Sequence, residues 1–178
     1  VEAQPGRSIL DRQVPEPWNG NLRDAKLLFL STNPSFGMLE EYPTGNSCEW
    51  PDERTVDFFT NRFGCGSELW TLEGRRARQA DGSFAKTDGK FWSQVAGKAR
   101  DVRGREYVRG VDWALTEVVH CKSLGGEGVA AAADFCAERY LLRILHHSAA
   151  KLILCLGRKT VWPVVQRILG IDPGQTLV

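Results

Sequence analysis

The chain has 178 residues, of which 42% are hydrophobic and 25% are charged, a composition typical of one globular domain rather than a disordered segment. With 23 basic and 22 acidic residues, the formal net charge of +1 excludes a dedicated, strongly basic nucleic-acid coat. No apolar run approaches the roughly 18 residues of a membrane span. The five cysteines never take a C-x-x-C spacing, which argues against a disulfide scaffold. We therefore expect a cytoplasmic monomer that does not contact a membrane.

The first half of the chain predicts one strand and one helix. Residues 1–25 are rich in proline, glycine and charge, and predict an extended arm on the surface. The continuous apolar run at 26–31 is typical of a strand buried on both faces. Residues 52–63 carry apolar side chains at helical spacing and predict a helix that ends at Gly64. Several glycines and many charges predict a loop over 65–90.

The second half repeats the alternation of strand and helix. Its predicted elements are, in chain order, a helix from Phe91, a strand at 113–119, a helix over 131–147, a strand at 151–156, a helix after Gly157 and the start of a strand at 176–178. The 131–147 helix carries an apolar stripe of four residues: Phe135, Leu141, Leu142 and Leu145.

Buried strands that alternate with amphipathic helices predict a parallel sheet covered by helices on both sides. We expect an α/β fold, a three-layer αβα sandwich around a central, mainly parallel four-stranded sheet. Ligands of such sheets bind beyond the carboxyl ends of the strands. This rule selects the loops at 32–37, 120–123 and 157–160 as the places for function.

The most informative segment is LLFLSTNPSFGM at 27–38. Asn33 follows the strand directly, and Pro34 restricts the backbone after it. An exposed asparagine offers one acceptor and one amide donor, which is enough to orient a water molecule. The alternative is an Asn-Pro turn that only ends a strand.

This segment resembles the first motif of the uracil-DNA glycosylase superfamily. In the mismatch-specific and single-strand-selective branches, a buried strand is followed by Gly-x-Asn-Pro-Gly, and the latter branch continues with Pro-Phe-Gly-Met. LTEVVHCK at 115–122, Cys136 with Tyr140-Leu141, and KLILCLG at 151–157 are similar, in the same order, to motifs of the iron–sulfur branch. The resemblance covers about residues 27–160. It implies a glycosylase-like domain at 26–178, truncated at its C-terminal end, after the arm at 1–25.

The resemblance implies that the protein hydrolyses the N-glycosidic bond of a uracil or another damaged base flipped out of DNA, without a cofactor. Asn33 would position the attacking water, and His120 is a second catalytic candidate, unless it is a loop histidine without function. The candidate substrate-binding residues frame the base or read its edge: Thr32, Pro34, Ser35, Phe36, Tyr42 and Glu117. The candidate DNA-binding residues follow the second and third predicted strands: Lys122, Ser123, Arg158, Lys159 and Thr160.

Three positions depart from the family's motifs. Ser31 and Ser35 stand where the family has glycine, and Glu117 stands where the family has an asparagine that reads uracil. An ionised glutamate only accepts hydrogen bonds, so it would suit a base with an amino or imino hydrogen and would repel the O4 of uracil. Burial could instead keep Glu117 protonated, or the side chain could face solvent.

The family's later His-Pro-Ser motif occurs nowhere in the chain, which truncation and true loss explain equally well. Cys121 and Cys136 fall near the second cysteine pair of the iron–sulfur branch. No cysteine precedes Cys48, and a cluster normally takes four thiolates, so we expect no cluster and no metal. Two alternatives stay open: a catalytically inactive DNA-binding member of the same fold, and an unrelated small-molecule-binding α/β domain.

Overall fold

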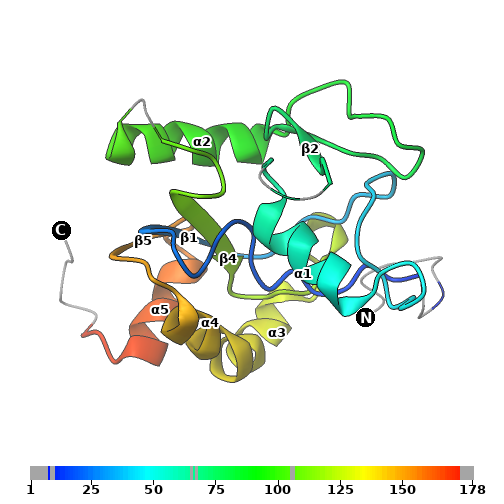
Figure 1. Ribbon diagram of the computed structural model, residues 1–178. Helices are drawn as coiled ribbons and strands as arrows, with labels where there is room; N and C mark the ends of the chain where they lie inside the picture. The colour runs from blue at the N-terminus through cyan, green and yellow to red at the C-terminus, as the bar shows by residue number, and fades with distance from the viewer. Residues whose placement is uncertain (1–7, 9–10, 65, 67, 105–106, 173–178) are drawn as a thin grey trace.

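Five consecutive buried residues form the central strand β1 (Leu27–Ser31), as the apolar run predicts. The computed structural model describes every residue except 1–7, 9–10, 65, 67, 105–106 and 173–178. β1 pairs in parallel with β4 (Trp113–Glu117) on one side and β5 (Leu152–Cys155) on the other, in the order β4-β1-β5 (Figure 1). The α/β class and the parallel sheet are thereby confirmed. The described sheet has three strands, not the four expected. The further strand predicted at 176–178 lies outside the described residues.

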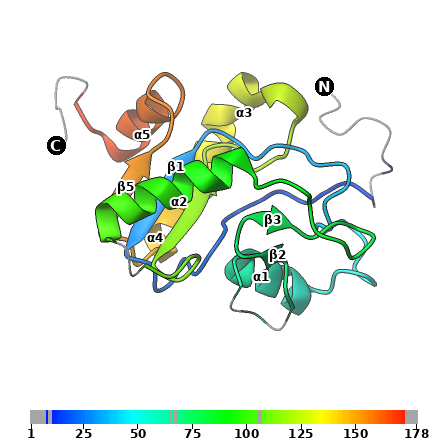
Figure 2. The same cartoon turned by 90° about the horizontal axis from the view of Figure 1, so that it is seen from above.

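Side chains that alternate along β1 pack against helices on the two faces of the sheet, as strand geometry requires. Leu27 and Phe29 share a core cluster with Val95 and Ala99 of α2 (Lys90–Arg103). Leu30 lies in a separate cluster. That cluster also contains buried residues of the C-terminal helices, including α5 (Val161–Leu169): Ala137, Leu141, Val161, Val164 and Val165. Figure 2 shows α2 crossing one face of the sheet.

The helix predicted over 131–147 forms in three joined parts. They are α3 (Val129–Cys136), a π-helical segment η2 (Ala137–Leu141) and α4 (Leu142–His147). Leu141 is fully buried, but Phe135 and Leu142 are 61% and 41% exposed, so half of the predicted stripe is wrong. The wider π turn places an extra residue in the helix, and the buried face follows Ala137, Leu141 and Ile144 instead.

A further cluster, made of buried aromatic residues, joins α1 (Asp52–Asn61) to the loops around it. Its members are Tyr42, Trp50, Phe58, Phe59 and Trp70. The segment 65–90, predicted as a loop, contains the short antiparallel strands β2 (Thr71–Leu72) and β3 (Arg76–Ala77). A 3-10 turn, η1 (Leu124–Gly126), follows β4. None of the helices in the described part of the chain has both the length and the apolar character that a membrane crossing requires.

Residues 13–25 of the predicted surface arm are extended, but six of them are buried. Asn19 exchanges two backbone hydrogen bonds of 2.8 Å with Leu115 of β4. Gly20, at φ +88°, approaches Trp113 so closely that a Cβ atom would lie 2.8 Å from its carbonyl oxygen. Glu16 is 3% exposed. The pairing with β4 therefore fixes this segment against the central sheet, while Pro15, Arg23 and Asp24 stay exposed.

Candidate functional site

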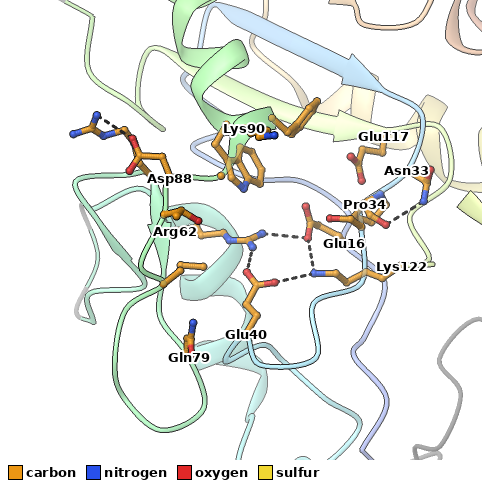
Figure 3. Close-up of a pocket in the computed structure, with 18 residues that line it drawn as sticks. Glu16, Asn33, Pro34, Glu40, Arg62, Gln79, Asp88, Lys90, Glu117 and Lys122 are labelled. Carbon is orange, nitrogen blue, oxygen red and sulfur yellow. Dashed lines mark hydrogen bonds and ion pairs between the residues drawn. The ribbon is translucent and has the colours of Figure 1, made fainter. Parts of the chain in front are cut away.

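A cavity of about 550 Å³ opens at the carboxyl ends of β1 and β4, where the strand order predicts a ligand site (Figure 3). Its volume lies in the range of small-molecule sites. The wall is built by the N-terminal segment, the loop after β1, the end of α1, the β3 region, the start of α2 and the end of β4. Four predicted substrate or catalytic residues line it: Asn33, Pro34, Ser35 and Glu117.

The Asn33 amide is fixed by its nitrogen. Nδ2 donates one hydrogen bond of 3.1 Å to the carbonyl oxygen of Pro34 and one of 3.0 Å to Oγ of Ser123. No residue that the structure describes donates a hydrogen bond to the Oδ1 of Asn33. The two bonds fix the orientation of the amide, and its oxygen lies 4.0 Å from the position that a Cβ atom would take on Gly126.

Glu117 is almost fully buried, at 2% exposure, and ends β4 beside the cavity. Its Oε1 accepts a hydrogen bond of 2.6 Å from Oγ of Ser31, its register partner on β1. Its buried Oε2 has no hydrogen-bond partner among the described residues. Burial, assisted by the negative charge of Glu16, holds the pKa of Glu117 well above its usual range. Burial thereby favours the neutral form of the Glu117 carboxyl over the ionised form.

Two buried cations and two carboxylates form a network in the wall of the cavity. Nη1 of Arg62 donates to Oε2 of Glu16 at 3.1 Å, and Nη2 donates to Oε1 of Glu40. Nζ of Lys122 lies 3.3 Å from Oε2 of Glu40 and 3.6 Å from Oε2 of Glu16. Figure 3 shows these four side chains joined by dashed lines. Each charge thus has an opposite charge in contact, as burial demands.

The network separates the protonation states of the two buried glutamates. Burial opposes the charge on Glu16, but the charges of Arg62 and Lys122 outweigh it, so the pKa of Glu16 lies below its usual value. Burial also opposes the charge on Arg62, and Glu40 and Glu16 reverse that effect and raise its pKa. With Glu16 ionised and Glu117 neutral, the two cations are balanced by Glu16 and Glu40.

Two residues predicted to bind DNA are buried instead. Lys122 is 2% exposed and lies 3.6 Å from the centre of the Tyr42 ring, so its ammonium group faces the network and not the surface. Ser123 is 3% exposed and accepts the hydrogen bond from Asn33. The sequence placed both after β4 correctly, but the chain turns inward there. Both side chains are therefore removed from the outer surface, and their contact with DNA stays a prediction.

His120 and Tyr42 do not line the cavity in which their predicted roles would place them. His120 is 5% exposed and does not line the cavity; its ring lies 5.9 Å from that of Tyr140. Tyr42 is buried in the aromatic cluster, and its hydroxyl donates to Glu16 at 2.9 Å, so it cannot stack on a base. Phe36 is half-buried and is not part of the cavity wall.

The remaining candidates lie at the end of β5. Arg158, Lys159 and Thr160 are exposed before α5, and their contact with DNA stays a prediction. Oγ1 of Thr160 lies 2.9 Å from Oγ1 of Thr32, so a hydroxyl pair joins the ends of β1 and β5. Thr32 is not part of the cavity wall.

The described cysteines are free thiols: Cys48, Cys121, Cys136 and Cys155. Burial raises the pKa of the Cys121 and Cys136 thiols, which favours the neutral form over the thiolate that a cluster needs. Within the described part of the chain, no group of three or more His, Cys, Asp or Glu side chains is arranged to hold a metal ion. Cys65 lies outside the described residues.

Sequence reasoning missed the acidic and basic side chains of the wall. Glu16 lies in a Pro-Glu-Pro segment, and Arg62 follows α1 directly; neither position carries a local signal. Phe91 and Trp92, at the start of α2, also line the cavity and were not predicted as site residues. Only the tertiary fold brings these segments together at the strand ends.

No family model matches the chain, and no curated protein matches it either. The resemblance to the uracil-DNA glycosylase superfamily therefore rests on the sequence motifs alone.

Proposed function

We propose that this protein is a DNA N-glycosylase that hydrolyses the bond between deoxyribose and a uracil or another damaged base flipped out of DNA. One observation carries the proposal: Asn33, the residue that the motif assigns to water, lies in the wall of a cavity of about 550 Å³ at the ends of β1 and β4. An enzyme of this kind needs such a cavity, because the target bond cannot be reached inside the base stack. The proposal includes the superfamily's three-layer αβα sandwich with a fourth strand in the sheet.

Asn33 would orient the attacking water. In the reaction, the water oxygen bonds to C1′ of the sugar, the C1′–N bond breaks, and the base leaves with the electron pair. The two hydrogen bonds of Nδ2 hold the amide, so Oδ1 would accept a hydrogen bond from the water and direct its lone pair. An amide takes up no proton, so the water's proton would pass to solvent or to the departing base.

The departing base carries negative charge, which the site must stabilise. In the family, the histidine of the His-Pro-Ser motif serves this purpose, but the tripeptide is absent from this sequence. Arg62 and Lys122 bring two cations into the cavity wall, and Glu117 offers a neutral carboxyl. Because Glu16 and Glu40 balance the charges of Arg62 and Lys122, the Glu117 carboxyl would replace the histidine as the hydrogen-bond donor to the departing base.

The test uses labelled oligonucleotides with a single uracil or hypoxanthine, as single strands and as duplexes. They are incubated with the protein and then with alkali, which breaks the strand at an abasic site. We expect strand breaks with the wild-type protein and a loss of about a hundredfold or more in Asn33→Ala. Asn61→Ala is the matched control, because that amide bonds to Asp57 outside the cavity.

Two results would overturn the proposal. Salt-dependent binding to DNA without strand breaks would identify an inactive DNA-binding member. No affinity for DNA at any salt concentration would identify a small-molecule-binding domain.

A further inference from the structure

A second cavity, of about 520 Å³, is formed by the segment before β1 together with α1 and α4. Among the described residues, none lines both this cavity and the candidate site. The carbonyl of Leu22, a residue of its wall, accepts a hydrogen bond of 3.2 Å from the backbone of Ala149, shortly before β5. The second cavity therefore lies toward the amino ends of β1 and β5, whereas the candidate site lies at the carboxyl ends of β1 and β4.

The floor of the second cavity is apolar. Leu22 and Ile144 are buried members of one core cluster, and Trp18 packs against that cluster. Val56 of α1 also lines the cavity and is 51% exposed. The indole Nε1 of Trp18 donates to Oγ1 of Thr60 at 3.4 Å, so this polar group of the floor already has a partner. Such a floor suits a ligand whose body is apolar.

The rim of the second cavity is basic. Arg23, Arg143 and His147 line it, and no aspartate or glutamate is among its described lining residues. Within the described part of the chain, no side chain forms an ion pair with the guanidinium of Arg23 or Arg143. The cations of the candidate site, in contrast, are balanced by buried carboxylates. The two guanidinium groups of the rim are therefore available to an anion from solution.

We propose that the second cavity binds a small carboxylate with a compact apolar body, independently of any chemistry at the candidate site. The apolar body would lie against Trp18, Leu22 and Ile144, and the carboxylate would reach Arg23 and Arg143. A guanidinium group binds a carboxylate with two parallel hydrogen bonds, which fixes the orientation of the ligand. A nucleotide fits less well, because burying its sugar hydroxyls at an apolar floor costs free energy.

The experiment measures dissociation constants by isothermal titration calorimetry with two probes, naphthalene-2-carboxylate and its uncharged relative naphthalene-2-carboxamide. The wild-type protein should bind the carboxylate about tenfold or more tightly than the carboxamide. Arg143→Gln should weaken carboxylate binding about tenfold and leave carboxamide binding unchanged. Val56→Asp, a change at an exposed position, adds a negative charge to the wall and should weaken carboxylate binding by a similar factor. Arg100→Gln, an exposed change on α2 outside both cavities, is the control.

NMR titration with the carboxylate probe locates the bound molecule. The backbone amide signals of Leu22 and Ile144 should shift, and those of Asn33 and Glu117 should stay in place. Equal affinities for the two probes, no binding of the carboxylate, wild-type affinity in Arg143→Gln, or shifts centred on Asn33 and Glu117 would each overturn the inference. Inorganic phosphate that binds as tightly as the carboxylate would also overturn it, because charge alone would then explain the binding.

Discussion

Oγ of Ser31 donates a hydrogen bond of 2.6 Å to Oε1 of Glu117, and the two residues are register partners on β1 and β4. Both are departures from the glycosylase motifs, which have glycine and asparagine at these positions. The two residues form one hydrogen-bonded pair, because the serine hydroxyl engages one oxygen of the carboxyl. A neutral carboxyl engaged in this way offers one O–H to the cavity, as an asparagine offers its NH₂.

The Glu117 proton should make stability fall as pH rises. Its pKa is raised in the folded protein, so the folded state keeps a proton that the unfolded chain releases near pH 4.3. This contribution is complete below that pH and is lost as pH rises through the folded pKa. We measure the free energy of unfolding in urea at pH 5, 6, 7 and 8. The value for Glu117→Gln should rise relative to the wild type by about 1.4 kcal/mol per pH unit until the pH reaches the pKa of Glu117 in the folded protein. Glu138→Gln should run parallel to the wild type, and parallel curves for Glu117→Gln would refute the assignment.

Arg62→Met should destabilise the protein by about 3–5 kcal/mol, because it leaves Glu16 and Glu40 buried with too little positive charge. The control is Arg103→Met, which removes an exposed pair with Asp112 and should cost about 1 kcal/mol or less. Urea denaturation at pH 7 measures both. Equal losses in the two variants would show that the buried network contributes no more than a surface ion pair.

His120 should make the protein sensitive to acid. Burial lowers the pKa of His120 from 6.5 to about 4. Between these two pH values the unfolded chain binds a proton at His120 and the folded chain does not. Stability is therefore complete above pH 6.5 and falls by about 3 kcal/mol as the pH drops to 4. His120→Gln should remove this dependence in urea unfolding between pH 4 and pH 7, and the exposed His147→Gln should keep it. Unchanged acid sensitivity in His120→Gln would contradict the prediction.

Ser123→Ala should lower the rate of base excision about tenfold by releasing Nδ2 of Asn33. Ser123 is a positioning residue, so the variant should lose kcat with little change in KM and with the fold intact by circular dichroism. The exposed Ser93→Ala should match the wild type. A Ser123→Ala rate equal to the wild type would show that the Pro34 carbonyl alone fixes the amide.

The parts of the site that the sequence predicts are those with a local signal. The apolar run at 27–31 determines a buried strand, and the rule of strand ends then places Asn33 at the cavity. The bond between Ser31 and Glu117 depends on the register of two strands far apart in sequence, which no local pattern reveals. Arg62 and Glu16 meet across 46 residues. Burial of either charge is favourable only when the other is buried beside it. In the sequence, each residue alone therefore predicts a surface position.

Glu16 belongs to the stretch that precedes the first strand, yet its carboxylate neutralises the interior beside Arg62 and Lys122. Any shortened version of this protein designed to begin at Lys26 would discard that anion together with the backbone bonds to Leu115. Removing the N-terminal residues to improve crystals would therefore remove part of the cavity wall. A shortened protein should begin no later than Gln13.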